Sequence, residues 1–153
     1  MSRHQLPEEK LQAGRQALAL LDEYELGVQG AAWIYIDVLK EWRFYIVTSL
    51  VTIDGLVDTH DRITRLFRLR FANPSLDLED IHLASPDEQL FLALSQVFHV
   101  QNGLVELENV GVNQLKIEHA YIYRLDRAPL VIKAKEARHK FDKKLKELER
   151  AAG

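Results

Sequence analysis

The chain has 153 residues, a net charge of -3 and no cysteine. This length suits one domain, and the absence of cysteine excludes disulfides, thiolate catalysis and thiolate metal sites while favouring a reducing compartment. No apolar run approaches the roughly 20 residues of a membrane span, and the acidic residues near the start do not resemble a secretory signal. We therefore predict a single cytoplasmic domain over residues 1–153 without membrane contact.

The first predicted element is a helix over residues 7–25. Pro7 and Glu8 stand in its first turn, where a fixed φ and an acidic side chain favour helix initiation. Two segments rich in branched and aromatic residues follow, and we predict strands over residues 31–37 and 43–50. The short connection between them implies an antiparallel hairpin.

Turn-forming residues then separate the second strand from a second helix. Asp54 and Gly55 predict a turn that ends the strand, and Asp58 predicts the N-cap of a helix over residues 59–69. The pair Asn73-Pro74 predicts a break beyond this helix.

A third strand and a third helix come next. Residues 78–84 predict the strand, and Ser85 predicts the N-cap of the following helix, with Pro86 in its first turn and Glu88 completing a capping box. We expect this helix to end near Val100, because an Asn-Gly pair follows.

The last part of the chain predicts a second hairpin and a long helix. The strands are expected over residues 104–108 and 116–125. Apolar residues of the helix, over residues 130–152, repeat after 11 positions, which does not favour an ordinary left-handed coiled coil. We therefore expect this helix to pack on its own domain or on a nearly straight partner helix.

The order of these elements predicts an α+β fold. Two antiparallel hairpins and one βαβ crossover strand give a five-stranded mixed sheet, packed with about four helices. The sequence does not predict the order of the strands in the sheet.

Alternate positions of the predicted strands separate aliphatic residues from aromatic and polar ones, because side chains on one side of a strand recur at every second residue. We expect the aromatic and polar residues to share one sheet face, which is either part of the core or a groove for a ligand or partner. The candidate binding residues are Trp33, Tyr35, Asp37, Arg43, Tyr45, His82, His119, Tyr121 and Tyr123.

Basic residues gather in two helices. Arg62, Arg65 and Arg68 recur at every third position. The segment from Lys133 to Arg150 contains eight Lys or Arg residues and only four Asp or Glu residues. Such helices suit a phosphate backbone or an acidic partner, but the rest of the chain is acidic and would repel a polyanion. We therefore keep nucleic-acid binding through the three arginines and the basic C-terminal helix as an alternative.

The sequence contains no recognisable catalytic or cofactor motif. Its six histidines show no pair at metal-ligand spacing, and no serine lies in a nucleophile elbow. Glu106 and Glu108 share a strand face, and we interpret them as solvated acids of an edge strand. We predict no catalytic residue, no metal site and no cofactor.

The function that we favour from the sequence is a non-catalytic, cytoplasmic interaction module. It self-associates or binds a protein partner through the aromatic sheet face, the C-terminal helix or both, since Tyr and Trp are enriched at interfaces. A small-molecule enzyme or sensor that uses the His and Tyr side chains is a second hypothesis.

Overall fold

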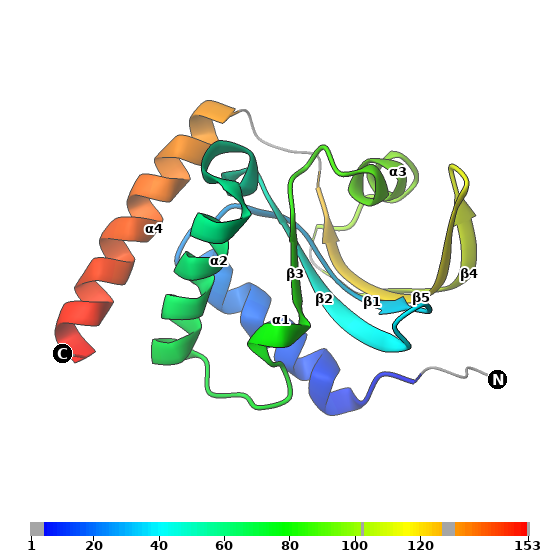
Figure 1. Cartoon of the computed structure of the whole chain (residues 1–153), viewed down its shortest axis with the longest axis horizontal. Helices are drawn as coiled ribbons and strands as arrows, with labels where there is room; N and C mark the ends of the chain where they lie inside the picture. Colours follow the sequence, from blue (N-terminus) through cyan, green and yellow to red (C-terminus); the bar gives the residue numbers. More distant parts are fainter. Residues whose placement is uncertain (1–4, 102, 127–130, 153) are drawn as a thin grey trace.

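The structure, a computed structural model, describes residues 5–101, 103–126 and 131–152. It confirms the predicted α+β class and mixed five-stranded sheet, whose strand order is β3-β2-β1-β5-β4. Helices lie on both faces of this sheet (Figure 1). The elements are α1 (Glu8–Glu23), β1 (Val28–Ile36), β2 (Glu41–Thr48), α2 (Leu50–Arg70), η1 (Leu78–Asp80), β3 (Ile81–Ala84), α3 (Gln89–Val97), β4 (Val105–Val112), β5 (Leu115–Leu125) and α4 (Val131–Ala152).

Two antiparallel hairpins and one crossover build the sheet. β1 pairs with β2, β5 pairs with β4, and the hairpins join through an antiparallel β1–β5 pair. β3 returns through α2 and lies parallel to β2. The β4–β5 turn contains Asn113 and Gln114, whose φ angles are 48° and 69°. Two consecutive positive φ angles match the twist of a tight hairpin, which fixes the register of β4 against β5.

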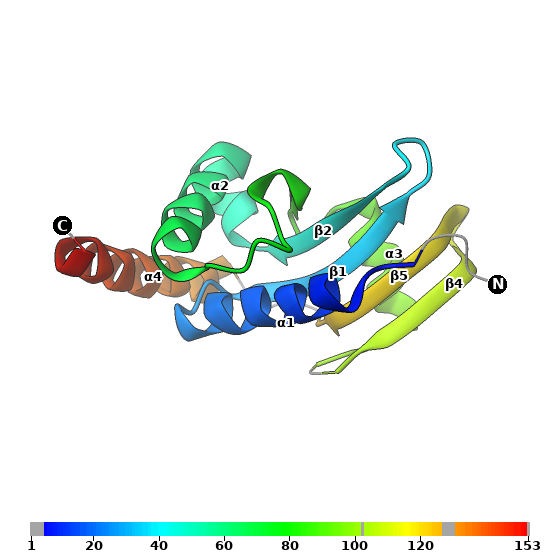
Figure 2. The same ribbon diagram turned by 90° about the horizontal axis from the view of Figure 1, so that it is seen from below.

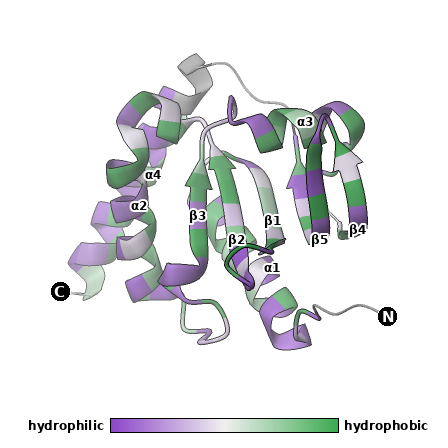
Figure 3. Cartoon of the chain, turned by 45° about the vertical axis from the view of Figure 1, so that its right-hand side comes forward, coloured by the Kyte–Doolittle hydropathy of each residue, from purple (hydrophilic) through white to green (hydrophobic). Residues whose placement is uncertain are grey.

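The helices divide the core into two parts. α1 and α2 cover one sheet face, on which Trp33, Phe44 and Tyr123 are buried. α3 covers the other face, where Ile34 and Ile122 are buried. Figure 2 shows the sheet between α1 and α3, and Figure 3 shows hydrophobic residues along the strands.

The C-terminal helix lies against α2 at one end of the molecule, while β4 lies towards the other end (Figures 1 and 2). Phe141 and Leu145 of α4 are buried in the core formed with α1 and α2. The ring of Phe141 meets Tyr24 edge-on, with 6.2 Å between centroids. An apolar stripe thus anchors α4 to the body of the protein.

The start of α2 differs from the prediction. The helix begins at Leu50, directly after β2, so that the predicted turn at Asp54-Gly55 and the predicted N-cap at Asp58 are both wrong. Gly55 instead makes a kink inside α2, with a φ of 87°. Glycine adopts this conformation without steric cost. The Asp54-Gly55 pair therefore produces a kink within α2 instead of a turn before it.

The start of α3 also differs from the prediction. The helix spans Gln89–Val97, and Glu88 occupies the N-cap position that was predicted for Ser85. The Ser85 hydroxyl bonds to the Asp87 carboxylate, and the backbone N–H of Glu88 donates to the Ser85 carbonyl over 3.1 Å. The segment from Ser85 to Glu88, which was expected to begin the helix, therefore forms a tight turn before it.

The two edges of the sheet differ in length and regularity. β3 has four residues, whereas β4 has eight and contains Asn109 with a φ of 51°. This left-handed conformation is uncommon for a residue with a side chain.

Across the described ranges, none of the helices has both the length and the apolar character needed to cross a membrane.

Candidate functional site

The residues predicted to share one aromatic face lie on both faces of the sheet, so that expectation is wrong. Trp33 pairs with Phe44, which places odd-numbered residues of β1 beside even-numbered residues of β2. Tyr45 therefore lies on the opposite face, which α3 covers, and its pairing with His82 places His82 of β3 on that face as well. The α1 face carries Trp33, Tyr35, His119, Tyr121 and Tyr123, the α3 face carries Arg43, Tyr45 and His82, and Asp37 is exposed in the β1–β2 turn.

Trp33 and Tyr123 belong to the core beneath α1. The indole N–H of Trp33 donates to the Lys10 carbonyl over 2.9 Å, and the Tyr123 hydroxyl donates to the Leu11 carbonyl over 2.6 Å. Burial raises the pKa of the Tyr123 phenol. The space that both polar atoms need is left by Gly14, whose missing Cβ would lie 2.6 Å from the Tyr123 hydroxyl. These two rings fix α1 on the sheet.

A second group of residues lies further along the same sheet face. We call it the aromatic–acidic patch, and it consists of Trp42, Glu106, Glu108, His119 and Tyr121. The rings of Trp42 and His119 lie 5.1 Å apart, and those of His119 and Tyr121 lie 4.9 Å apart. Trp42 and Tyr121 are half-buried, whereas the His119 side chain is only 2% exposed. The imidazole is therefore buried and packs against both aromatic rings, whose own centroids lie 5.7 Å apart.

The β4–β5 hairpin brings both acids of the patch to this histidine. Glu108 stands directly opposite His119, and Glu106 stands opposite Tyr121. His119 Nε2 lies 2.7 Å from Glu106 Oε2 and 3.5 Å from Glu108 Oε1. The two carboxylate side chains are 45% and 48% exposed, so they are open to solvent while the histidine is not.

The patch carries an excess of negative charge. The hydrogen bond with His119 lowers the pKa of Glu106, and burial together with the negative charge of Glu106 raises the pKa of Tyr121. In the part of the chain that the structure describes, neither glutamate forms an ion pair with a lysine or arginine. Carboxylates beside aromatic faces attract positive charge by Coulomb forces and cation–π interactions.

The predicted residues of the α3 face form a smaller group. Tyr45 and His82 stack with 4.4 Å between centroids, and His82 Nε2 lies 3.7 Å from the Glu88 carboxylate. Arg43 donates to the Glu79 carbonyl over 2.7 Å. The adjacent cavity between α3 and the sheet has about 20 Å³ of free volume, which is the space of a single water rather than of a substrate.

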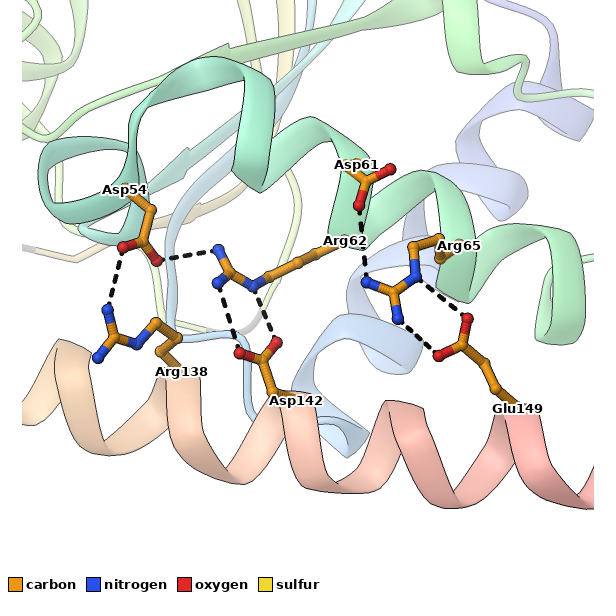
Figure 4. A network of polar contacts seen from close by, with 7 residues as sticks. All are labelled: Asp54, Asp61, Arg62, Arg65, Arg138, Asp142 and Glu149. Atoms are coloured by element: carbon orange, nitrogen blue, oxygen red, sulfur yellow. Dashed lines mark hydrogen bonds and ion pairs between the residues drawn. The ribbon is translucent and has the colours of Figure 1, made fainter.

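Arg62, Arg65 and Arg68 of α2 do not form one exposed stripe. Arg62 bonds to Asp142 and Asp54, Arg65 bonds to Glu149, and the exposed Arg68 lies outside this network (Figure 4). Arg138 of α4 also pairs with Asp54, at 3.0 Å. Arg62 and Arg65 therefore hold α4 against α2.

Sequence reasoning missed Trp42 and did not connect the two glutamates with His119. Trp42 was placed outside the second strand, although the structure includes it in β2. The signal that could have found the group is the hairpin register. A two-residue turn at Asn113-Gln114 pairs residue 108 with residue 119 by counting alone.

Comparison with known proteins gives no match, since no family model fits the chain and no curated protein or solved structure is significantly similar to it. The aromatic–acidic patch is therefore defined by its own geometry. That geometry combines a buried imidazole, two exposed carboxylates and two aromatic rings, which together suit a positively charged ligand or partner.

Proposed function

We propose that this protein is a non-catalytic, cytoplasmic interaction module that self-associates, with the aromatic–acidic patch of one copy binding helix α4 of the next. The observation that carries this proposal is that α4 and β4 lie at opposite ends of the molecule (Figure 1), with exposed basic residues on α4 and the exposed Glu106 and Glu108 on β4. The absence of cysteine supports a reducing compartment for it.

The basic surface lies on the solvent-exposed side of α4, and its Lys146 lies next to α2. Its members recur at steps of three or four residues, so that they form one stripe along the helix. We call it the basic stripe. It consists of the exposed residues Lys135, His139, Lys143, Lys146 and Arg150.

The chemistry of the two surfaces is complementary. Lysine ammonium groups of the stripe can pair with Glu106 and Glu108 and lie over the faces of Trp42 and Tyr121, where cation–π contacts contribute about 0.5–1 kcal/mol each. Exposed ion pairs contribute about 0.2–1 kcal/mol each and are screened by salt. The proposed association is therefore weak, dependent on concentration and sensitive to ionic strength.

The two other functions considered from the sequence have less support. A small-molecule pocket near Tyr45 would need more room than the cavity beneath α3 offers. Nucleic-acid binding would have to use Arg68 and the basic stripe, because the guanidinium groups of Arg62 and Arg65 are paired with carboxylates.

Sedimentation velocity over a range of protein concentrations, in low-salt and high-salt buffers, tests the proposal. We expect the average mass to rise with concentration at low salt and to return to that of the monomer at high salt. A protein that remains monomeric at the highest concentration in low salt would overturn the proposal.

A charge swap identifies the two surfaces. We expect self-association to be lost in the Glu106→Lys/Glu108→Lys variant and in the Lys143→Glu/Lys146→Glu variant. Mixing the two variants should restore assembly, because each patch then meets a stripe of opposite charge. The matched control is Glu9→Lys/Glu79→Lys, which changes the net charge equally at exposed positions outside the patch and should still associate. Failure of the mixture to assemble would exclude the patch–stripe interface.

A further inference from the structure

We propose that Glu106, Glu108 and His119 form a binding site for a divalent transition metal ion, with Zn²⁺ as the ion that the donor set fits best. This site goes beyond the proposed self-association and does not depend on it. One ligand atom from each of the three residues can be chosen so that all three lie within 4.8 Å of one another.

The separations of the ligand atoms are close to those of a zinc site. Zinc–ligand bonds of 2.0–2.2 Å in a tetrahedron place neighbouring ligand atoms roughly 3.3 Å apart. His119 Nε2 lies 2.7 Å from Glu106 Oε2 and 3.5 Å from Glu108 Oε1. Metal entry therefore requires the 2.7 Å separation to lengthen by roughly 0.6 Å and the exposed carboxylates to adjust around the ion, and it replaces the hydrogen bond with metal bonds.

The types of ligand select the class of metal. An imidazole nitrogen with two carboxylates suits zinc and neighbouring first-row metals, whereas magnesium and calcium prefer oxygen ligands alone. Three protein ligands leave a fourth position for water or for another ligand, as in zinc sites that are not purely structural. Because the chain has no cysteine, histidine is the side chain that best suits a transition metal in this protein.

The surroundings hold the histidine and leave the acids free to adjust. The buried His119 ring packs against Trp42 and Tyr121, which also contact each other, so its Nε2 has a fixed direction. The exposed carboxylates of β4 provide an approach from solvent. A site with one fixed ligand and two adjustable ligands can capture an ion without a rearrangement of the sheet.

Two negative charges next to one imidazole also favour a cation. A bound divalent ion would neutralise the repulsion between Glu106 and Glu108, which stand two residues apart on one strand face. A simple hydrogen-bonded His–Glu pair requires only one of these acids. Removing Glu108 therefore distinguishes the metal site from a structural hydrogen bond.

Isothermal titration calorimetry of the chelator-treated protein with Zn²⁺ tests the site. We expect one ion per chain for the wild type and an affinity lower by more than about tenfold for both Glu108→Gln and Glu106→Gln. His139→Ala, which removes an exposed histidine from α4, is the control and should bind as the wild type does. Ni²⁺ should compete with Zn²⁺, and Mg²⁺ should not.

A second measurement covers the case in which a His119 variant fails to fold. Zn²⁺ should raise the melting temperature of the wild type, but not that of the Glu106→Gln/Glu108→Gln variant. Zinc binding that is absent, or unchanged in this double variant, would overturn the site. Sedimentation in the presence of a chelator separates the two proposals: self-association without zinc binding refutes only the metal site, and zinc binding by a permanent monomer refutes only the proposed function.

Discussion

Trp33 and Trp42 lie on the same face of one sheet, yet one belongs to the core and the other to the surface. Trp33 is fully buried beneath α1 and donates a hydrogen bond to the Lys10 carbonyl. Trp42 is half-buried and packs against His119 and Tyr121. Alternation along a strand assigns a residue to a face, whereas the position of the covering helix decides whether that face is closed.

The largest effect is expected where the closed region has no spare room. In Gly14→Ala, the new Cβ would lie 2.6 Å from the Tyr123 hydroxyl and 2.7 Å from Trp33 Nε1. We expect the free energy of unfolding to fall by about 2–4 kcal/mol, because overpacking is added to two disturbed hydrogen bonds and outweighs the helix propensity of alanine. Urea unfolding followed by circular dichroism measures this loss.

Gly103→Ala is the control for this substitution. The nearest atom to a Cβ at position 103 is 4.0 Å away, in Val100. Its free energy of unfolding should stay within about 0.5 kcal/mol of the wild type. Equal stability of the two variants would show that α1 does not pack on the rings as described.

The same substitution at the two tryptophans compares the regions directly. Trp33→Phe should cost about 2 kcal/mol, because the indole hydrogen bond to the Lys10 carbonyl is lost and a void remains in the core. Trp42→Phe should cost less than about 1 kcal/mol, since a half-buried ring is replaced by another ring. Comparable losses in chemical denaturation would contradict the division into core and surface.

Tyr123→Phe gives a smaller loss that depends on pH. At neutral pH the loss of the hydrogen bond to Leu11 should cost about 1–2 kcal/mol. Because burial raises the pKa of Tyr123, the folded state keeps its proton when pH rises above the ordinary value of 10.0, whereas the unfolded state loses it. The wild type therefore loses stability from this group as pH rises through that range.

The Tyr123→Phe variant should show a shallower decrease in stability at alkaline pH, and the two proteins should approach each other there. Unfolding curves at neutral pH and at a pH just above 10 measure the change. A difference that stays constant between the two conditions would mean that Tyr123 titrates normally.

The smallest effect is expected in the open region. Glu106→Gln replaces an exposed carboxylate by an amide of nearly the same size, and the free energy of unfolding should change by less than about 0.5 kcal/mol. Binding assays of the aromatic–acidic patch should respond to the same variant. A large loss of stability would instead assign Glu106 to the framework of the sheet.

The sequence predicted the fold class because local signals and chain order agreed. The apolar positions of α1 and the branched residues of β1 and β2 place these elements within a few residues of their observed bounds. The starts of α2 and α3 were wrong, because Asp54-Gly55 and Ser85 carry turn chemistry that is compatible with a kink or a turn as well as with a cap.

The candidate site was predicted only within single strands. His119 and Tyr121 do share a face, as alternation requires. Tyr45 was placed with them wrongly, because alternation within β2 cannot reveal its register against β1, and a shift of one residue exchanges the two faces. The register of β4 against β5 was accessible from its tight turn, but that of β1 against β5 depends on tertiary packing.

The left-handed Asn109 affects how the outer edge of the sheet meets other chains. A regular, uncharged edge strand is a template for further strands and hence for aggregation. β4 is the longer edge, but Asn109, with a φ of 51°, interrupts its regular backbone, and Glu106 and Glu108 precede it with two negative charges. Copies of this protein should therefore meet through side chains rather than by extending one continuous sheet, which keeps their assembly reversible and discourages fibrils of the cross-β type.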